Sequence, residues 1–429
     1  MKCNLFILSY GLIAVLHAGS PVPREVAYSE LKPAAPGLKA ENPEGLDGRV
    51  LAGYQGWFRA EGDGAKLGFR HYEKRGRFEP GSCTIDLWPD LTDFRKDEKF
   101  PTPFRHADGT VAHVFSSIHP QTVDRHFEWM AEYGLDGVFV QRFGSHGAKV
   151  RRDYRSLQFD NRKLVLARDA AIKHRRAWAL MYDLSGLRDD DFDRLAEDWK
   201  NLRRRMTLGT DVNDTSYLRL NGKPLVAIWG VGFGDNRAYS LEKCEWFIRL
   251  LKHNPDWGGM SIMLGIPYHW RKREGDAENH ARLHEVLKLA DVLSPWSIGR
   301  YRNEDSAFNI MRHQQADLAW CQENKLGYLP VLFPGFSWQN MEGQDEVVIE
   351  REGGRFLWRQ FQATAMACNR GAYIAMFDEI DEGTAIFKVT NDPPVGLSKF
   401  QTFEGRPPDH YLWLVGEGRR LLRGELPSR

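Results

Sequence analysis

The sequence has no excess of either charge, and this balance bears on the partners it can have. Its 59 lysines and arginines nearly cancel its 58 aspartates and glutamates. Basic triplets such as residues 203–205 are scattered along the chain and are typical of a solvated helix face. Nucleic-acid binding needs many clustered contacts between basic side chains and phosphates. We therefore expect no nucleic-acid partner.

Cysteine is also scarce, and its spacing argues against a cysteine metal site. Beyond the N-terminal segment the cysteines are widely separated and form no CxxC pair: they are Cys83, Cys244, Cys321 and Cys368. Structural zinc sites use closely spaced cysteines, so metal ligation by cysteine is poorly supported. An oxidising compartment would permit a disulfide, for example between Cys321 and Cys368, and buried free thiols are an equal alternative.

Histidine shows no recognised spacing of metal ligands either. The stretches HADGTVAH (106–113) and SSIH (116–119) do not match a ligand motif. The histidines in this part of the chain are typical of surface or hydrogen-bonded positions, and they are His71, His106, His113 and His119. The sequence therefore predicts neither a metal nor a cofactor.

Long hydrophobic runs are missing as well, apart from one near the N-terminus. Residues 1–18, MKCNLFILSYGLIAVLHA, have a basic start, an apolar run of about a dozen residues and a small residue at Ala18, the layout of a secretory signal. The run is too short to span a bilayer. We expect residues 1–18 to be a cleaved signal peptide, which predicts a secreted or periplasmic protein without stable membrane insertion. Residues 19–46 are predicted to be a flexible lead-in.

The sequence does contain a recurring pattern of short apolar runs. The runs are nearly continuous in apolar character, which is typical of parallel strands covered on both faces. They span residues 49–58, 134–143, 177–186, 223–230, 260–270, 290–301, 327–338 and 372–379. From residue 134 onward they start roughly 30 to 46 residues apart, the size of a strand-plus-helix unit.

Segments with helical periodicity lie between the apolar runs. Residues 122–134 place Val123, Phe127 and Met130 on one face, and residues 356–371 show the same pattern. Eight strand-and-helix units predict a single α/β domain over residues 47–429, a (β/α)8 TIM barrel. The excess residues at roughly 60–115 are predicted to be a large insertion in the first βα connection.

Aromatic and polar residues gather at the carboxyl ends of the predicted strands, where the active sites of such barrels lie. The candidate substrate-binding residues are Tyr54, Trp57, Gln141, Arg142, Asp183, Trp229, Tyr268, His269, Trp270, Trp296 and Trp338. Indole rings stack on the apolar faces of sugars, and the polar side chains can hold hydroxyl groups. Any single Trp is better explained by core packing than by sugar binding, because Trp is largely buried in most folds. Their recurrence at equivalent strand ends favours a carbohydrate substrate.

The last run ends in four carboxylates within five positions: Asp378, Glu379, Asp381 and Glu382. If the chain turns after Glu379, then Glu379 and Glu382 face one cleft about 5–6 Å apart, a separation typical of retaining glycosidases. Crowding also raises the pKa of one member, which keeps a proton available for a leaving group. These two glutamates are the candidate catalytic residues, and the two aspartates would tune them or bind hydroxyls. Alternatively, the acids cap a helix or hold a cation for metal-assisted hydrolysis.

Three motifs together resemble a known family. The run FDEIDEGT (377–384) looks like the signature YNEWHEGT of glycoside hydrolase family 99, the endo-α-mannosidases and endo-α-mannanases, and more loosely like the WNDYGE run of family 71. With GYQGWF (53–58) and HFEWMAEYGLDGVFVQRF (126–143), the chain resembles bacterial glycoside hydrolase family 71/99-like proteins, some of which are labelled xylosidase or arabinosidase. This resemblance runs from about residue 50 to residue 388.

The family 99 resemblance implies roles for the two glutamates. Glu379 would take the proton of the sugar 2-hydroxyl, so that O2 attacks C1 and gives a 1,2-anhydro sugar, and Glu382 would be the general acid and base. The chain departs from the signature at Asp378, Ile380 and Asp381, where the family has Asn, Trp and His. The hypothesis is an exported hydrolase of an α-linked glycan, with a mannan-like substrate favoured. The alternatives are a xylosidase or arabinosidase and a non-hydrolytic carbohydrate-binding barrel.

Overall fold

The centre of the protein is a ring of parallel strands that follow the eight predicted runs. The computed structural model describes residues 20–37, 41–343 and 348–427. The strands of the ring are β1 (Val50–Tyr54), β4 (Gly137–Phe143), β5 (Ala177–Asp183), β7 (Lys223–Trp229), β8 (Ser261–Pro267), β9 (Val292–Trp296), β10 (Gly327–Tyr328), β11 (Val331–Leu332) and β12 (Ala372–Ile374). Every residue of β1, β5 and β8 is buried, as expected for strands covered on both faces.

The ring closes through a single run of the sequence that contributes two short strands. Around the ring the order is β10, β9, β8, β7, β5, β4, β1, β12 and β11. Pro330 separates β10, which pairs with β9, from β11, which pairs with β12. Proline has no N–H to donate to a ladder, which explains the break. The predicted (β/α)8 barrel of TIM type is thereby confirmed.

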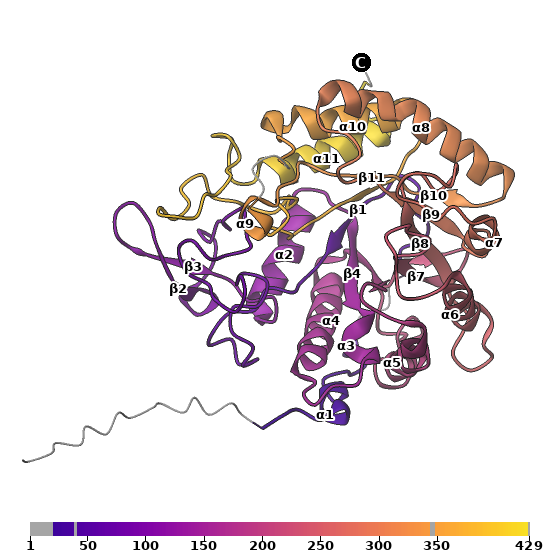
Figure 1. Cartoon of the computed structure of the whole chain (residues 1–429), viewed down its shortest axis with the longest axis horizontal. Coiled ribbons are helices and arrows are strands. Elements are labelled where there is room, and N and C mark those ends of the chain that lie inside the picture. The colour runs from indigo at the N-terminus through magenta and orange to yellow at the C-terminus, as the bar shows by residue number, and fades with distance from the viewer. Residues whose placement is uncertain (1–19, 38–40, 344–347, 428–429) are drawn as a thin grey trace, which may run out of the picture.

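Helices surround the ring (Figure 1). They are α2 (Pro120–Glu132), α3 (Gly144–Ala148), α4 (Arg155–His174), α5 (Phe192–Arg205), α6 (Leu241–His253), α7 (Arg282–Leu287), α8 (Glu304–Glu323), α9 (Gln339–Glu342), α10 (Arg355–Met366) and α11 (His410–Leu422). The predicted face of α2 is confirmed, since Val123, Phe127 and Met130 are buried. A short strand, β6 (Arg219–Leu220), pairs antiparallel with β7.

The insertion in the first βα connection packs onto the barrel. It holds the antiparallel hairpin of β2 (Phe100–Arg105) and β3 (Val111–Val114), which lies to the side of the barrel (Figure 1). Isolated bridges join it to a late part of the chain, for example Leu87 to Gln401 and Arg105 to Val395. Its aromatic residue Trp88 is buried in the same hydrophobic cluster as the outward faces of the strands. The insertion therefore extends the barrel's own core.

The side chains of the ring alternate between its interior and its exterior, as the strand period of two requires. Phe139, Met181 and Met263 belong to one cluster inside the ring. Their neighbours, such as Val140 and Tyr182, belong to the larger cluster between the strands and the helices. Which of two adjacent residues at a strand end faces the interior therefore decides which one reaches a ligand.

Part of the segment predicted to be a lead-in, residues 19–46, forms a short helix. The segment contains α1 (Arg24–Tyr28), and the apolar residues Ala27 and Tyr28 of this helix are buried, as are Leu31 and Ala34 of the irregular chain that follows it. The predicted signal peptide at residues 1–18 lies outside the described residues. Within the described ranges no helix is long and apolar enough to cross a membrane. Cys83, Cys244, Cys321 and Cys368 are free thiols.

Candidate active site

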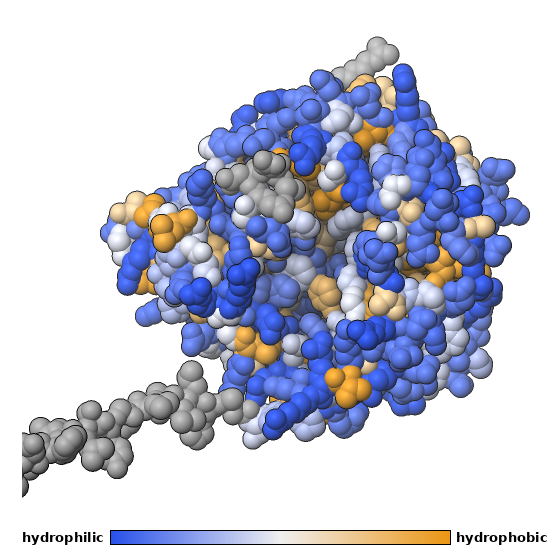
Figure 2. All heavy atoms as spheres, viewed as in Figure 1, coloured by the Kyte–Doolittle hydropathy of each residue, from blue (hydrophilic) through white to orange (hydrophobic). Residues whose placement is uncertain are grey.

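A cleft of about 540 Å³ lies at the carboxyl ends of the strands. The face shown in Figure 2 is hollowed near its middle, while most of the surrounding surface is hydrophilic. The cleft is lined by Gln55, Trp57, Gln141, Phe143, Asp183, Ser185, Trp229, Trp296, Ile298, Gly299, Arg300, Arg302, Phe336, Trp338, Ile349, Glu379 and Glu382. Its volume is in the range of small-molecule sites. The structure thus brings together the two predicted catalytic glutamates and Trp57, Gln141, Asp183, Trp229, Trp296 and Trp338.

Glu379 is the more deeply buried of the two glutamates. Its Oε1 accepts a hydrogen bond from Gln55 Nε2 at 2.8 Å, and its Oε2 accepts one from the Thr384 hydroxyl at 3.0 Å. Burial raises the pKa of Glu379 well above its usual range, and repulsion from Glu382 and Asp381 raises it further. The two hydrogen bonds oppose this rise because they stabilise the charged form.

Glu382 lies in the same cleft, within the turn that residues 380–383 form after Glu379. Burial raises its pKa to about 7, and the negative charge of Asp183 contributes to the rise. The indole of Trp338 lies beside Glu382 and lowers the pKa in part, although its N–H does not complete a well-aligned hydrogen bond. A carboxyl group with this pKa holds a proton through much of the neutral range.

Asp378 holds the backbone of the site together and does not line the cleft. It is fully buried, and its two carboxylate oxygens accept hydrogen bonds from the backbone N–H groups of Gln55 (2.8 Å) and Gly56 (2.7 Å). Burial raises its pKa to about 6. Asp378 therefore fixes the segment that carries Gln55 toward Glu379, a positioning role in place of the predicted contact with substrate.

Asp381 lies behind the cleft, beside a histidine of the insertion. Its Oδ2 is 3.6 Å from His71 Nδ1, and its Oδ1 is buried without a partner among the described residues. Burial and repulsion from Glu382 raise the pKa of Asp381, while burial lowers the pKa of His71. His71 stacks on Trp57 with ring centroids 4.2 Å apart, and Phe143 also stacks on Trp57, with ring centroids 5.5 Å apart. The indole of Trp57 is thereby held in one orientation.

Several buried polar atoms of the cleft have no hydrogen-bond partner within the described ranges. They are Oε1 of Gln55 and of Gln141, and Nε1 of Trp57, of Trp229 and of Trp338. Leaving a buried donor or acceptor unpaired costs about 1–3 kcal/mol. A ligand with several hydroxyl groups would satisfy both the donors and the acceptors.

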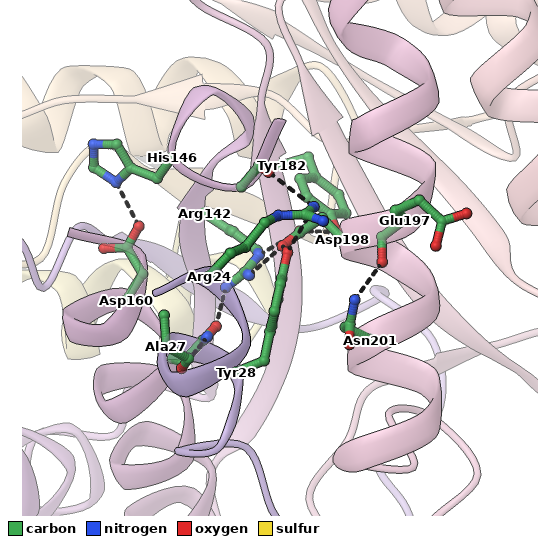
Figure 3. A network of polar contacts seen from close by, with 12 residues as sticks. Arg24, Ala27, Tyr28, Arg142, His146, Asp160, Tyr182, Glu197, Asp198 and Asn201 are labelled. Carbon is green, nitrogen blue, oxygen red and sulfur yellow. Dashed lines mark hydrogen bonds and ion pairs between the residues drawn. The ribbon is translucent and has the colours of Figure 1, made fainter. Parts of the chain in front are cut away.

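Arg142 is directed away from the cleft, contrary to the prediction. Residue 141 faces the ring interior, so Arg142 faces the helices. There its Nε and Nη2 donate to the two carboxylate oxygens of Asp198 at 2.7 and 2.6 Å. The hydroxyls of Tyr28 and Tyr182 donate to the same carboxylate at 2.6 and 2.7 Å, and Figure 3 shows these groups converging on it. The Asp198 carboxylate on α5 thus joins Arg142 of β4, Tyr182 of β5 and Tyr28 of the N-terminal segment.

Four more predicted residues also lie outside the cleft. Tyr54 faces outward, and its hydroxyl is 3.0 Å from His126 Nδ1. After β8 the chain turns away from the ring axis: Tyr268 stacks on His313 of α8, His269 pairs with Asp276, and Trp270 is fully buried against Trp320. The chain after β9 supplies this side of the cleft with Arg300 and Arg302 instead.

Residues that were not predicted complete the site. Lys163 of α4 is buried, and its Nζ donates to the backbone oxygens of Gln55 (3.0 Å) and Gln141 (2.7 Å), which ties the end of β1 to the end of β4. Burial lowers the pKa of Lys163 to about 8. Gln55 and Thr384 lie inside the quoted motifs GYQGWF and FDEIDEGT, which was a usable signal. Nothing local in the sequence marks His71 or Lys163.

The four crowded carboxylates do not converge as ligands of one metal ion. Over residues 20–37, 41–343 and 348–427, no group of three or more His, Cys, Asp or Glu side chains is placed to hold a metal. Asp378 is occupied by backbone N–H groups, and Asp381 lies behind the cleft. The arrangement brings two acids, Glu379 and Glu382, to one ligand-sized cleft.

The structure is similar to solved structures of an endo-α-mannosidase of glycoside hydrolase family 99 from Bacteroides thetaiotaomicron. The TM-score is 0.63 at 14% identity, over 89% of this chain and 100% of the other, and a second structure of that enzyme with bis-tris-propane gives 0.61. A glycoside hydrolase-like protein matches with a TM-score of 0.51 at 13% identity, over 91% of this chain and 98% of that one. No family model and no curated protein matches by sequence. The likeness shows a glycoside hydrolase-like fold and agrees with the resemblance in the three motifs.

Proposed function

We propose that the protein is a glycoside hydrolase that cleaves an α-linked glycan, with a mannan-like substrate favoured. The observation that carries this proposal is the pair Glu379 and Glu382 in one cleft, both with raised pKa values. Hydrolysis of a glycosidic bond needs an acid at the leaving oxygen and a second carboxylate at the sugar ring. The unpaired polar atoms and the indole rings of the same cleft suit hydroxyl groups and the apolar faces of sugar rings.

Glu382 is the proposed general acid. With a pKa of about 7 it carries a proton near neutral pH and can give it to the glycosidic oxygen as the C1–O bond breaks. The resulting carboxylate can then take a proton from the water that enters. Asp183 keeps the pKa of Glu382 high across this cycle by its negative charge.

Glu379 is the proposed base. Two buried carboxyl groups that repel each other share about one proton near neutral pH. The hydrogen bonds from Gln55 and Thr384 stabilise the charged form of Glu379, the form that acts as a base, against the burial and the repulsion from Glu382 that raise its pKa. Glu379 would take the proton of the 2-hydroxyl while O2 attacks C1 and the leaving group departs. Water then opens the 1,2-anhydro sugar at C1, and Glu379 returns the proton to O2, so that the configuration at C1 is retained.

The test is digestion of α-mannans, α-glucans and xylans with the wild type and with Glu379→Gln and Glu382→Gln, with products read by mass. The expected result is cleavage of α-mannan by the wild type and by neither variant. Cleavage of xylan alone would replace the substrate assignment. Binding of a glycan with no cleavage of any would overturn the hydrolase proposal in favour of a carbohydrate-binding barrel.

We propose in addition that the protein is exported, on the basis of residues 1–18. Sequencing the N-terminus of the protein recovered from the medium or periplasm tests this proposal. The expected mature chain starts close after Ala18 and retains α1, which packs on the barrel. Recovery of the intact N-terminus from the cytoplasm alone would contradict it.

A further inference from the structure

A second cavity, of about 470 Å³, adjoins the cleft. Ser185, which follows β5, lines both spaces and so joins them. The other lining residues that matter here are Lys149, Arg188, Asp235, Arg237 and Tyr239. A glycan that leaves the cleft past Ser185 would place its next unit in this cavity.

Arg237 is held rigidly between the cleft and this cavity. Its Nη1 donates to the Ser185 and Tyr239 hydroxyls, both at 3.1 Å, and its Nε donates to Asp235 at 2.9 Å. The guanidinium lies over the ring of Trp229, a cleft residue, with its carbon 5.0 Å from the centroid. Its Nη2 has no partner among the described residues. A fixed guanidinium loses little freedom when it binds a ligand.

Two other cations of the cavity have no ion-pair partner in the described part of the chain, and they are Lys149 and Arg188. Asp235, the carboxylate that lines the cavity, is already paired with Arg237. The nearby Asp189 accepts hydrogen bonds from Ser240 and does not line the cavity. Asp191 accepts a hydrogen bond from the Arg188 backbone N–H and does not line the cavity either. The lining residues therefore carry three positive charges, on Lys149, Arg188 and Arg237, and one negative charge, on Asp235.

We propose that this cavity binds an anionic substituent of the glycan, a carboxylate or a sulfate ester, on the sugar unit next to those held in the cleft. Both groups present several oxygens that match the planar fork of arginine. A neutral sugar would leave Lys149 and Arg188 without a partner, whereas an anion attracts both through Coulomb interaction. The assignment rests on the proposed function, because it takes the ligand of the cleft to be a glycan.

The experiment compares one α-mannan in three forms: untreated, partly oxidised at C6 to carboxylates, and partly sulfated. Affinity electrophoresis measures the binding of each form to the full-length wild type, to Lys149→Gln/Arg188→Gln and to Lys223→Gln/Lys325→Gln. The last variant is the matched control, since Lys223 starts β7 and Lys325 precedes β10, at the opposite end of the barrel. Both variants lose two positive charges.

The wild type is expected to bind at least one anionic form about tenfold more tightly than the neutral form, the size of a few charge-assisted contacts. Lys149→Gln/Arg188→Gln should lose this preference and keep its affinity for neutral mannan. The control, Lys223→Gln/Lys325→Gln, should retain the preference for the anionic form. Whether the carboxylate or the sulfate form gains more identifies the substituent.

Equal binding of the neutral and anionic forms by the wild type would overturn the assignment, and so would equal losses in the two variants. Failure of the proposed function gives a different result. In that case the wild type would keep the preference for the anionic form while no glycan is cleaved and Glu382→Gln changes nothing.

Discussion

Asp198 and Glu379 are both buried carboxylates of one barrel, with exposed fractions of 1% and 3%, yet their surroundings differ. Asp198 receives hydrogen bonds from Arg142, Tyr28 and Tyr182, and these partners lower its pKa despite burial. Among the described residues no cation pairs with Glu379, and its burial together with repulsion from Glu382 raises its pKa.

The difference separates a structural site from a site poised for chemistry. At Asp198 the chain satisfies a charge completely, which holds β4, β5, α5 and α1 together (Figure 3). In the cleft it keeps like charges close together, which costs stability but leaves a proton available for transfer. Buried acids alone therefore do not identify an active site, and the partners of each acid do.

Replacement of the cleft acids should give the largest effect. Glu382→Gln and Glu379→Gln are each expected to lower kcat by about a thousandfold, within the range for general acid–base groups, without loss of thermal stability. An aryl glycoside with an activated leaving group needs no acid, so it should restore activity to Glu382→Gln and not to Glu379→Gln. Steady-state kinetics on both substrates measures this. Equal rescue of the two variants would contradict the division of roles.

Replacement of Arg142, the cationic partner of Asp198, should lower stability and leave catalysis largely unchanged. Arg142→Met leaves the Asp198 charge buried with only hydroxyl donors, which should lower the free energy of unfolding by about 3–5 kcal/mol. Urea denaturation measures it. The control is Arg142→Met/Asp198→Leu, which removes both charges and should recover part of the loss. If Arg142→Met lowered kcat as much as Glu382→Gln does, the conclusion that Asp198 is structural and the cleft acids are catalytic would be contradicted.

The pH dependence of activity should report Glu382. Because its folded pKa is about 7, Glu382 carries its proton below pH 7 and loses it above pH 7. The kcat/KM of the wild type should therefore fall about tenfold for each pH unit above about 7. A pH profile from 5 to 9 tests this, with Glu382→Gln as the control that lacks this limb. A flat profile up to pH 9 would remove Glu382 from the acid role.

Removal of the charge at Asp381 should give the smallest effect and the opposite sign. The folded pKa of Asp381 is raised above its unfolded value, so the native protein loses stability as pH rises through that interval. Asp381→Asn lacks this loss and should be more stable than the wild type by about 1 kcal/mol at pH 8. The difference in the free energy of unfolding between Asp381→Asn and the wild type should be smaller at pH 4. Urea denaturation at both pH values checks the sign, and destabilisation at pH 8 would show that Asp381 is favourably paired in the folded protein.

The fold was predictable because each strand is apolar on both faces and each outer helix is apolar on one. For the same reason it was harder to predict which residue at each strand end faces the cleft. In the run GVFVQRF the apolar residues occupy both faces, so nothing in it shows that Gln141 faces the cleft and Arg142 the helices. Trp229 and Trp296 were found because they end their strands, whereas Tyr268, His269 and Trp270 follow β8 after the chain has turned outward. His71 reaches Trp57 only through the folding of the insertion.

The joint that closes the ring has a mechanical consequence. β10 and β11 each pair over only two residues, whereas β4 and β5 pair over their full length. The amides of Leu329, Tyr373 and Ala375 donate across this joint, each at 2.9 Å. Fewer ladder bonds must break to part the strands here, so these amides should exchange with deuterium sooner than those of β4 and β5. The segment that bears Glu379 therefore lies beside the most weakly paired strands of the ring. The barrel can open slightly there when a ligand enters, while β4 and β5 keep their positions.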